Sequence, residues 1–264
     1  HLSDIHVHNE DDSALEKIPL TADVVNANPA EYENIIILIS GDLAFSGAES
    51  QYAALNKSLE LLIEKLVTKG FDRSKIDVLM VPGNHDGEFK KSSKARGFTI
   101  DGVRREKAVD DETSDICAKP QEKYFEFEGA YISNKINTRV SEKLLKIYSI
   151  NSKLGVIEFW CLNTSWMSVV PEQPGTLFFP IELLEKHLCE SVHLRFAIIH
   201  HPLNWYIQEN YHPLRELILK GFNGVFSGHE HSDGVRQVSD IINGESCLFF
   251  EAGALGPYSS SEPI

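Results

Sequence analysis

Short apolar runs recur along the chain, and several of them end directly before a residue that could bind a metal ion. Residues 35–40 are apolar and mostly β-branched, which predicts a buried strand that delivers Asp42 at its carboxyl end. A second such run, residues 76–81, leads into residues 83–86, Gly-Asn-His-Asp. Between the two, apolar residues spaced by three and four positions over residues 52–66 predict a helix. Strand, helix and strand together predict a βαβ unit.

The same pattern recurs in the second half of the chain. Strands are predicted at residues 156–162, 196–199 and 224–227, and helices at residues 181–188 and 211–219. The last two strands run into His200 and into a Gly-His-Glu-His sequence. Ligands of open α/β sheets bind beyond the carboxyl ends of the strands, so we expect these polar residues to converge there. The fold class is therefore predicted to be α/β.

Residues 87–149 are the least regular part of the sequence. Aromatic residues between Tyr124 and Tyr131, and then Leu144, Leu145 and Tyr148, predict helices in its second half. We interpret residues 87–149 as an insertion beside the site, within a single domain spanning residues 1–264. If Asp4 ends a strand, only three residues precede it, so we expect missing upstream sequence and further domains outside this chain.

Composition indicates a globular protein with no membrane-spanning part. Of the 264 residues, 42% are hydrophobic and 24% are charged, as in ordinary soluble domains. No apolar stretch approaches the roughly 20 residues that span a bilayer, and no secretory signal is visible. The four cysteines lack CxxC spacing, which favours reduced thiols and a cytoplasmic location over a disulfide framework or a zinc knuckle.

The charge distribution bears on nucleic-acid binding. A net charge of −14 argues against general affinity for polyanions. Between Lys90 and Lys107, however, basic residues outnumber the acidic Asp101 and Glu106. These basic residues are Lys90, Lys91, Lys94, Arg96, Arg104, Arg105 and Lys107. The segment is either a solvated loop or a patch that holds a nucleic-acid backbone.

Five short sequence fragments supply two Asp, one Asn and four His that could surround two metal ions. They contain Asp4, His6, Asp42, Asn84, His200, His229 and His231. Each alone has an ordinary explanation, such as a capping Asp or a surface His pair. Together, imidazole nitrogens and carboxylate oxygens favour two divalent transition-metal ions, such as Mn, Fe or Zn, over Ca or Mg. A carboxylate can bridge two ions about 3.5–4 Å apart, and a bridging water becomes a hydroxide nucleophile near neutral pH.

The order DxH, GD, GNHD, HxP and GHxH resembles the calcineurin-like metallophosphoesterases. The resemblance implies a fold of two packed mixed β-sheets flanked by helices, a four-layer sandwich. It also implies metal ligands: one ion would be held by Asp4, His6 and His231, the other by Asn84, His200 and His229, and Asp42 would bridge them. In that family the His of GNHD, here His85, is a catalytic residue that faces the substrate, where it stabilises phosphoryl oxygens or protonates the leaving group.

The residues around Asp42 indicate which branch of this family the chain resembles. Residues 41–47, Gly-Asp-Leu-Ala-Phe-Ser-Gly, lack the GDxxDRG pattern of the protein serine/threonine phosphatases and its Asp that orients the catalytic His, which disfavours that activity. They look more like the cyclic-nucleotide-phosphodiesterase-like branch, as do residues 162–166. The predicted function is hydrolysis of a nucleotide or another phosphodiester by a metal-bridging hydroxide.

Two other functions stay open at this point. The chain could be a metal-dependent nuclease, acting as the catalytic domain of a larger multidomain protein, with the Lys90–Lys107 segment on the nucleic acid. It could also be a non-catalytic scaffold module with the same fold. Loss of metal ligands would be the sequence sign of such a module, and here the full set is present.

Overall fold

The structure is a computed structural model that describes residues 1–25, 28–89, 93–131, 136–188 and 192–256. Its helices are α1 Ser13–Val24, α2 Glu49–Thr68, α3 Lys94–Glu106, α4 Asp111–Ala118, α5 Glu122–Tyr131, α6 Ile181–Glu185 and α7 Gln208–Gly221. Its strands are β1 Ile35–Ile39, β2 Ile76–Met80, β3 Asn137–Ser141, β4 Leu145–Ser152, β5 Gly155–Leu162, β6 Leu194–Ile198, β7 Gly224–Ser227, β8 Gly234–Asp240 and β9 Glu245–Glu251.

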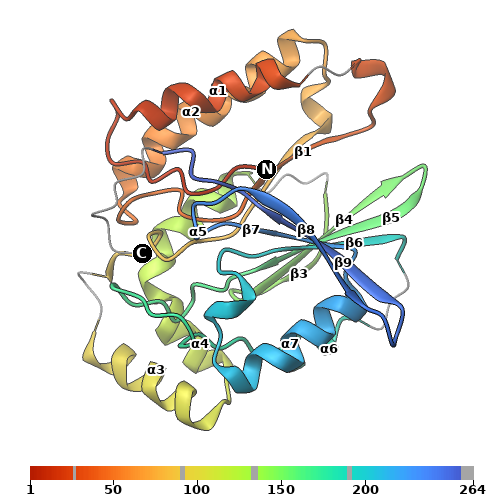
Figure 1. Cartoon of the computed structure of the whole chain (residues 1–264). Coiled ribbons are helices and arrows are strands. Elements are labelled where there is room, and N and C mark those ends of the chain that lie inside the picture. Colours follow the sequence, from red (N-terminus) through yellow and green to blue (C-terminus); the bar gives the residue numbers. More distant parts are fainter. Residues whose placement is uncertain (26–27, 90–92, 132–135, 189–191, 257–264) are drawn as a thin grey trace.

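The described strands form two sheets. β1 and β2 pair in parallel, and the other seven strands form a mixed sheet in the order β3-β4-β5-β6-β7-β9-β8. Within it the central strands β5, β6, β7 and β9 are parallel, whereas the outer pairs are antiparallel. Figure 1 shows α1 and α2 on one outer side of the sheets and α3, α4, α6 and α7 on the other.

The alternation of side chains along each strand explains this four-layer arrangement. In β1, Ile37 and Ile39 pack toward α1 and α2, while Leu38 packs against the larger sheet. In β5, Phe159 belongs to the core between the two sheets, and Trp160 belongs to the core beneath the outer helices. Successive residues of a strand point to opposite faces, so every strand buried on both faces contributes to two cores. The predicted α/β class and sheet packing are confirmed.

The helix predicted around Leu144, Leu145 and Tyr148 is wrong, because these residues lead into and form strand β4. Leu145 and Ile147 face the outer core, and Tyr148 faces the core between the sheets. A strand buried on both faces reads as a continuous apolar run, which periodicity does not separate from a buried helix. The predicted insertion therefore includes strand residues of the larger sheet, whereas α3, α4 and α5 form its helical part.

The other predicted helices and strands agree with the structure within a few residues. The helix predicted at residues 52–66 is α2, and the strands predicted at residues 35–40 and 76–81 are β1 and β2. Among the described helices, none has the length and apolar character needed to cross a membrane. The described cysteines, Cys117, Cys161 and Cys247, are free thiols.

Candidate metal centre

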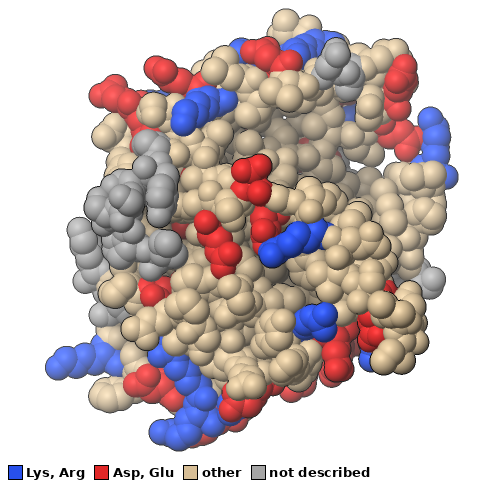
Figure 2. All heavy atoms as spheres, viewed as in Figure 1, with Lys and Arg blue, Asp and Glu red and all other residues tan. Residues whose placement is uncertain are grey.

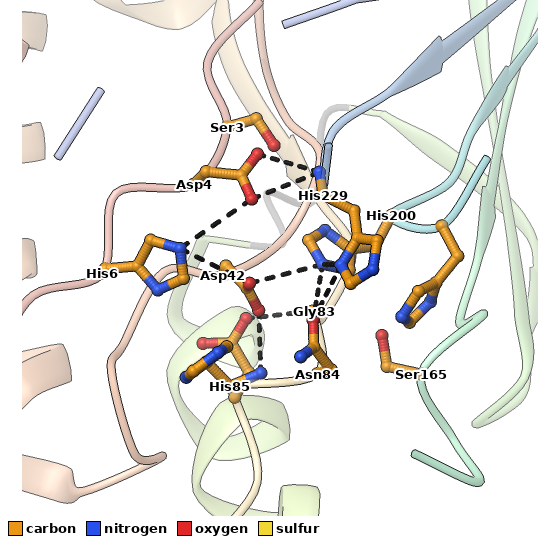
Figure 3. Close-up of polar contacts among 12 residues, drawn as sticks. Ser3, Asp4, His6, Asp42, Gly83, Asn84, His85, Ser165, His200 and His229 are labelled. Carbon is orange, nitrogen blue, oxygen red and sulfur yellow. Dashed lines mark hydrogen bonds and ion pairs between the residues drawn. The ribbon is translucent and has the colours of Figure 1, made fainter. Parts of the chain in front are cut away.

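The predicted metal-binding residues lie in loops at the carboxyl ends of neighbouring strands. Asp42 follows β1, Asn84 follows β2, His200 follows β6 and His229 follows β7. The amino-terminal segment lies beside β1, where Leu2 bridges Ile39 in parallel and the Asp4 backbone N–H donates to the Gly41 carbonyl. Because parallel strands place their carboxyl ends at one edge, residues far apart in sequence meet in one site. Figure 3 shows the side chains of six of them pointing toward one another: Asp4, His6, Asp42, Asn84, His200 and His229.

Glycines before the metal-binding residues allow this close approach. A Cβ atom on Gly41 would lie 2.3 Å from Nδ1 of His200, and one on Gly83 would lie 2.0 Å from Oδ1 of Asp42. At Gly228 a Cβ atom would lie 1.9 Å from Oγ of Ser3 and 2.6 Å from Oδ2 of Asp4. Any side chain at these three positions would displace a residue of the site, which explains the Gly in each motif.

The backbone of the site is strained. Five predicted ligands have φ angles in the left-handed region, between 51° and 75°: Asp4, His6, Asp42, His229 and His231. For residues other than glycine this conformation is uncommon and costs about 1–3 kcal/mol each. Such strain concentrates at functional sites, where the surrounding packing enforces it.

The first half of the site brings together Asp4, His6 and His231. Nε2 of His231 lies 3.3 Å from Oδ1 of Asp4, and Nε2 of His6 lies 3.2 Å from Nε2 of His231. Oδ2 of Asp42 is 3.6 Å from Nε2 of His6. The carboxylate of Asp4 is held in place by the backbone N–H of His229, which donates to it at 3.0 Å. The ligand atoms of Asp4, His6 and His231 are thus close enough to bind one ion.

The second half brings together Asn84, His200 and His229. Oδ1 of Asn84 lies 3.0 Å from Nε2 of His200 and 3.1 Å from Nδ1 of His229, and these two ring nitrogens are 3.1 Å apart. Oδ2 of Asp42 lies 3.4 Å from Nε2 of His200. Asp42 therefore presents the same oxygen to both halves of the site.

The donor chemistry of the second half fits a cation. Nδ1 of His200 lies 2.8 Å from the Ser40 carbonyl, so Nδ1 carries the proton and Nε2 of a neutral His200 presents a lone pair. That lone pair faces the oxygens of Asn84 and Asp42, which are acceptors as well. Buried acceptors that face one another need a proton or a metal ion between them.

The pKa values of the metal-free site also indicate that a positive charge is needed between these buried acceptors. Burial lowers the pKa of His200, but the Asp42 carboxylate outweighs burial and raises this pKa to about 10. Burial alone would raise the pKa of Asp42, but His200, His85 and His6 hold it well below its usual range. Burial lowers the pKa of His229 well below its usual range, which keeps this imidazole neutral, as a metal ligand must be.

His85 lies beside these residues but is oriented differently. Its backbone N–H donates to Oδ1 of Asp42 at 2.8 Å, and Nδ1 of its ring lies 3.0 Å from the Phe45 carbonyl. Nδ1 therefore carries a proton directed at this carbonyl, and Nε2 remains for other partners. His85 is half-buried and its ring centre lies 4.8 Å from that of His6. The Phe45 carbonyl thus orients the His85 ring, in place of the Asp that residues 41–47 lack.

Asp86 is a buried residue of the site that was not among the predicted ligands. Its buried carboxylate accepts hydrogen bonds from the backbone N–H groups of Leu43, Ala44 and Gly83 and from the Tyr52 hydroxyl. These bonds tie the loop carrying Asp42 to the loop carrying Asn84. Its place at the end of the Gly-Asn-His-Asp fragment is the sequence feature that could have indicated this role.

A comparison with protein families is consistent with this geometry. The family of the calcineurin-like phosphoesterases matches residues 1–233. The chain belongs to this family. A calcineurin-like phosphoesterase hydrolyses phosphoric esters, so the fold and the His and Asp clusters have a common explanation.

Other comparisons add little about this phosphoesterase. No curated protein matches its sequence. One matching solved structure is a hypothetical protein from Thermus thermophilus, which is 14% identical. The match covers 98% of the present chain and 77% of that chain, with a TM-score of 0.48.

Proposed function

We propose that this calcineurin-like phosphoesterase is a di-metal phosphodiesterase that hydrolyses small nucleotide-type diesters. The observation that carries the proposal is the position of Asp42. Its Oδ2 atom lies 3.6 Å from Nε2 of His6 and 3.4 Å from Nε2 of His200, so one carboxylate oxygen faces both clusters of ligand atoms. A shared carboxylate is what two neighbouring cations need to offset their repulsion.

The seven predicted ligands divide between two ions. Asp4, His6 and His231 would hold one ion, and Asn84, His200 and His229 the other, with Asp42 shared. When bound, two such ions polarise the phosphoryl group and activate a shared water as the nucleophile. The mixture of imidazole nitrogen with carboxylate and amide oxygen suits Mn, Fe or Zn.

His85 would act on the substrate as a general acid. The Phe45 carbonyl fixes a proton on Nδ1, so a protonated His85 offers Nε2–H to the leaving oxygen and a neutral one does not. The bond from its backbone N–H to Asp42 couples its position to the bridging carboxylate. Proton donation by a positioned side chain contributes about 10²–10⁴-fold to rate.

An aromatic surface next to His85 supports a nucleotide-type substrate. His8 stacks on Phe45 with ring centres 3.9 Å apart, and Phe45 lies 5.4 Å from the ring of His85. The His8 ring belongs to an exposed residue, and Phe45 is partly exposed. Flat aromatic surfaces bind nucleobases by stacking, worth about 1–3 kcal/mol per base. This surface supports the cyclic-nucleotide-phosphodiesterase-like branch over one that acts on aliphatic esters.

The nuclease alternative receives less support from the basic segment. Lys90 and Lys91 lie outside the described residues, and Arg96 is buried, where it donates to the carbonyls of Cys117, Trp166 and Ser168. Arg104 donates to the Thr176 carbonyl, Arg105 pairs with Glu106, and Lys107 pairs with Glu209. On the face in Figure 2, Lys and Arg side chains are interspersed with Asp and Glu. Binding of a polyanion by this segment therefore remains the weaker proposal.

A substrate panel at two salt concentrations tests the proposal. Mn-loaded protein would be assayed with a cyclic nucleotide, a nucleoside diester, glycerophosphocholine, single-stranded DNA and duplex DNA. We expect hydrolysis of the nucleoside diesters with little change between about 50 and about 200 mM salt, because few charges are neutralised. Cleavage of DNA alone, falling about 10³-fold or more over that range, would instead establish a nuclease.

The variant Phe45→Leu adds a matched comparison within the same panel. It should raise KM for the nucleoside diesters about fivefold or more, because a stacking surface is lost, and leave glycerophosphocholine unchanged. Binding of two metal ions without hydrolysis of any ester would favour the scaffold module instead.

A further inference from the structure

His229 lacks the usual means of fixing a metal-binding imidazole. Such a residue normally donates its second ring N–H to a carboxylate or carbonyl, which sets the orientation of the ring. Nδ1 of His229 faces Asn84 and His200, and its other nitrogen, Nε2, is buried without a hydrogen-bond partner in the part of the chain described. Its orientation must therefore come from packing.

Two aromatic rings pack directly against His229. The centre of the His201 ring lies 4.4 Å away at an interplanar angle of 57°, and the centre of the Trp205 ring lies 4.1 Å away at 87°. Trp205 is fixed in turn by Glu230, whose Oε1 accepts from Nε1 of Trp205 at 3.2 Å and from Nδ2 of Asn204 at 2.8 Å. Glu230, the Glu of the Gly-His-Glu-His fragment, thus fixes the Trp205 ring that packs against His229.

His201 is held by hydrogen bonds on both of its ring nitrogens. Nε2 lies 2.7 Å from Oε2 of Glu172, and Nδ1 lies 3.2 Å from Oγ1 of Thr164. Oγ1 of Thr164 accepts from the backbone N–H groups of both His200 and His201, at 3.2 and 3.1 Å. The Glu172 carboxylate only accepts hydrogen bonds, so Nε2 of His201 carries the proton that is donated to it, and Nδ1 is the unprotonated nitrogen that faces Thr164. The ring has one orientation that satisfies all these bonds.

Burial of the Glu172 side chain at this position is unfavourable in free energy. It is 6% exposed, and its carboxylate faces the His201 ring and the Ser168 hydroxyl. Burying a carboxylate costs several kcal/mol, and a single ion pair does not reliably offset that cost. Replacing both partners of a buried pair by apolar residues of similar volume is often neutral or stabilising, so stability alone does not explain a buried Glu172–His201 pair.

We propose that Glu172, His201 and Trp205 form a clamp that positions the His229 ring for metal binding. The proposal rests on the metal centre described above, and it makes Glu172, His201 and Trp205 positioning residues that do not touch the substrate. A carboxylate usually bonds directly to the imidazole that binds the metal. Here the carboxylate of Glu172 bonds to His201 instead, and the His201 ring orients His229 by contact. The clamp sets the affinity of the ion that His229 would bind.

The variants Glu172→Leu and Glu172→Gln test the clamp. Glutamine still accepts the proton of His201 Nε2, whereas leucine keeps the volume and removes the acceptor. Titration of metal-free protein with Mn²⁺ should show the ion bound by His229 weakened about 10–100-fold in Glu172→Leu and nearly unchanged in Glu172→Gln. In metal-free protein, NMR of the imidazole groups should show one ring environment for His229 in the wild type and in Glu172→Gln, and an altered or averaged one in Glu172→Leu.

Two further variants make the outcome decisive. Glu128→Leu removes a buried carboxylate that pairs with Lys146 in another part of the fold, so it should lower stability and leave Mn²⁺ affinity unchanged. If Glu172→Leu does not fold, His201→Gln keeps a donor for Glu172 and removes the ring, and it should weaken the same ion.

Three outcomes separate the clamp from the proposed function. Wild-type Mn²⁺ affinity and an unchanged His229 ring environment in Glu172→Leu or His201→Gln would overturn the clamp. Equal weakening in Glu128→Leu would overturn it too, by showing a general effect of stability. If the wild type bound no metal, the proposed function would fail, and the ring environment in metal-free protein would still decide the clamp.

Discussion

Replacing Gly41 by alanine should dismantle the metal centre through one added methyl group. The new Cβ atom would lie 2.3 Å from Nδ1 and 2.6 Å from Cγ of His200. An ordinary van der Waals contact requires about 1 Å more, so the His200 ring has to move. That ring is fully buried, and its Nδ1 is bonded to the Ser40 carbonyl at 2.8 Å. Displacing it breaks this bond and moves Nε2 away from Asn84 and Asp42.

The cost has two parts. Gly41 has a φ angle of +103°, a conformation that costs other residues about 1–3 kcal/mol. Overpacking a buried contact adds about 1–3 kcal/mol. Gly41→Ala should therefore lower the free energy of unfolding by about 2–6 kcal/mol and remove at least one bound metal ion. Urea denaturation gives the first quantity, and elemental analysis of the dialysed protein gives the second.

Gly97→Ala is the matched control for this change. Gly97 lies in α3, where an added Cβ atom meets nothing within 4 Å, so alanine should raise stability by about 0.5–1 kcal/mol and spare the metal. A Gly41→Ala protein with wild-type stability and wild-type metal content would refute the reasoning, because the contact with His200 would then not constrain the site.

Three other predictions concern residues around the bridging carboxylate. His85→Ala should retain both metal ions and lower kcat about 10²–10⁴-fold, since the residue acts on the leaving group; lost metal or unchanged kcat in elemental analysis and steady-state kinetics would contradict this. Tyr52→Phe removes a buried donor to Asp86 and should cost about 1–2 kcal/mol in urea denaturation with metal content intact, whereas equal stability would show that the bond contributes nothing. Because Asp42 raises the pKa of His200 to about 10, metal-free protein at pH 7 should hold a proton there and release it on metal binding. Calorimetry in buffers of different ionisation enthalpy should detect about one proton or more released per protein when metal binds. The apparent affinity for the metal should rise with pH up to about 10. If no proton were released, His200 would not carry this proton in the metal-free protein.

The sequence predicted the parts of the molecule that depend on local pattern. β1, β2, β6 and β7 were visible as apolar runs, and Asp42, Asn84, His200 and His229 as the polar residues that follow them. Their convergence followed from one rule about the carboxyl ends of parallel strands. The structure brings these side chains together, and their division between two ions stays a prediction until metal is bound.

Other features depend on contacts that no local pattern encodes. β4 was mistaken for a helix because both of its faces are buried and its apolar residues do not alternate with polar ones. Glu172 lies in a loop 29 positions before His201, and nothing in its sequence neighbourhood indicates that the two meet. The sequence made Arg96 a candidate for binding a phosphate backbone, but it is buried and its guanidinium bonds to three carbonyls. Burial of a charged side chain is decided by the packing around it, which only the folded chain shows.

Metal stoichiometry in the wild type and in Asp42→Asn tests the central claim most directly. The shared Oδ2 atom predicts two Mn²⁺ ions per wild-type protein, and anomalous diffraction should place them on either side of Asp42 at a separation of about 3.5–4 Å. Asn keeps the shape of Asp42 and removes its charge, so the variant should bind one ion or none and lose hydrolysis of bis(p-nitrophenyl) phosphate. Two ions and wild-type hydrolysis in Asp42→Asn would contradict the bridging role and the centre built around it.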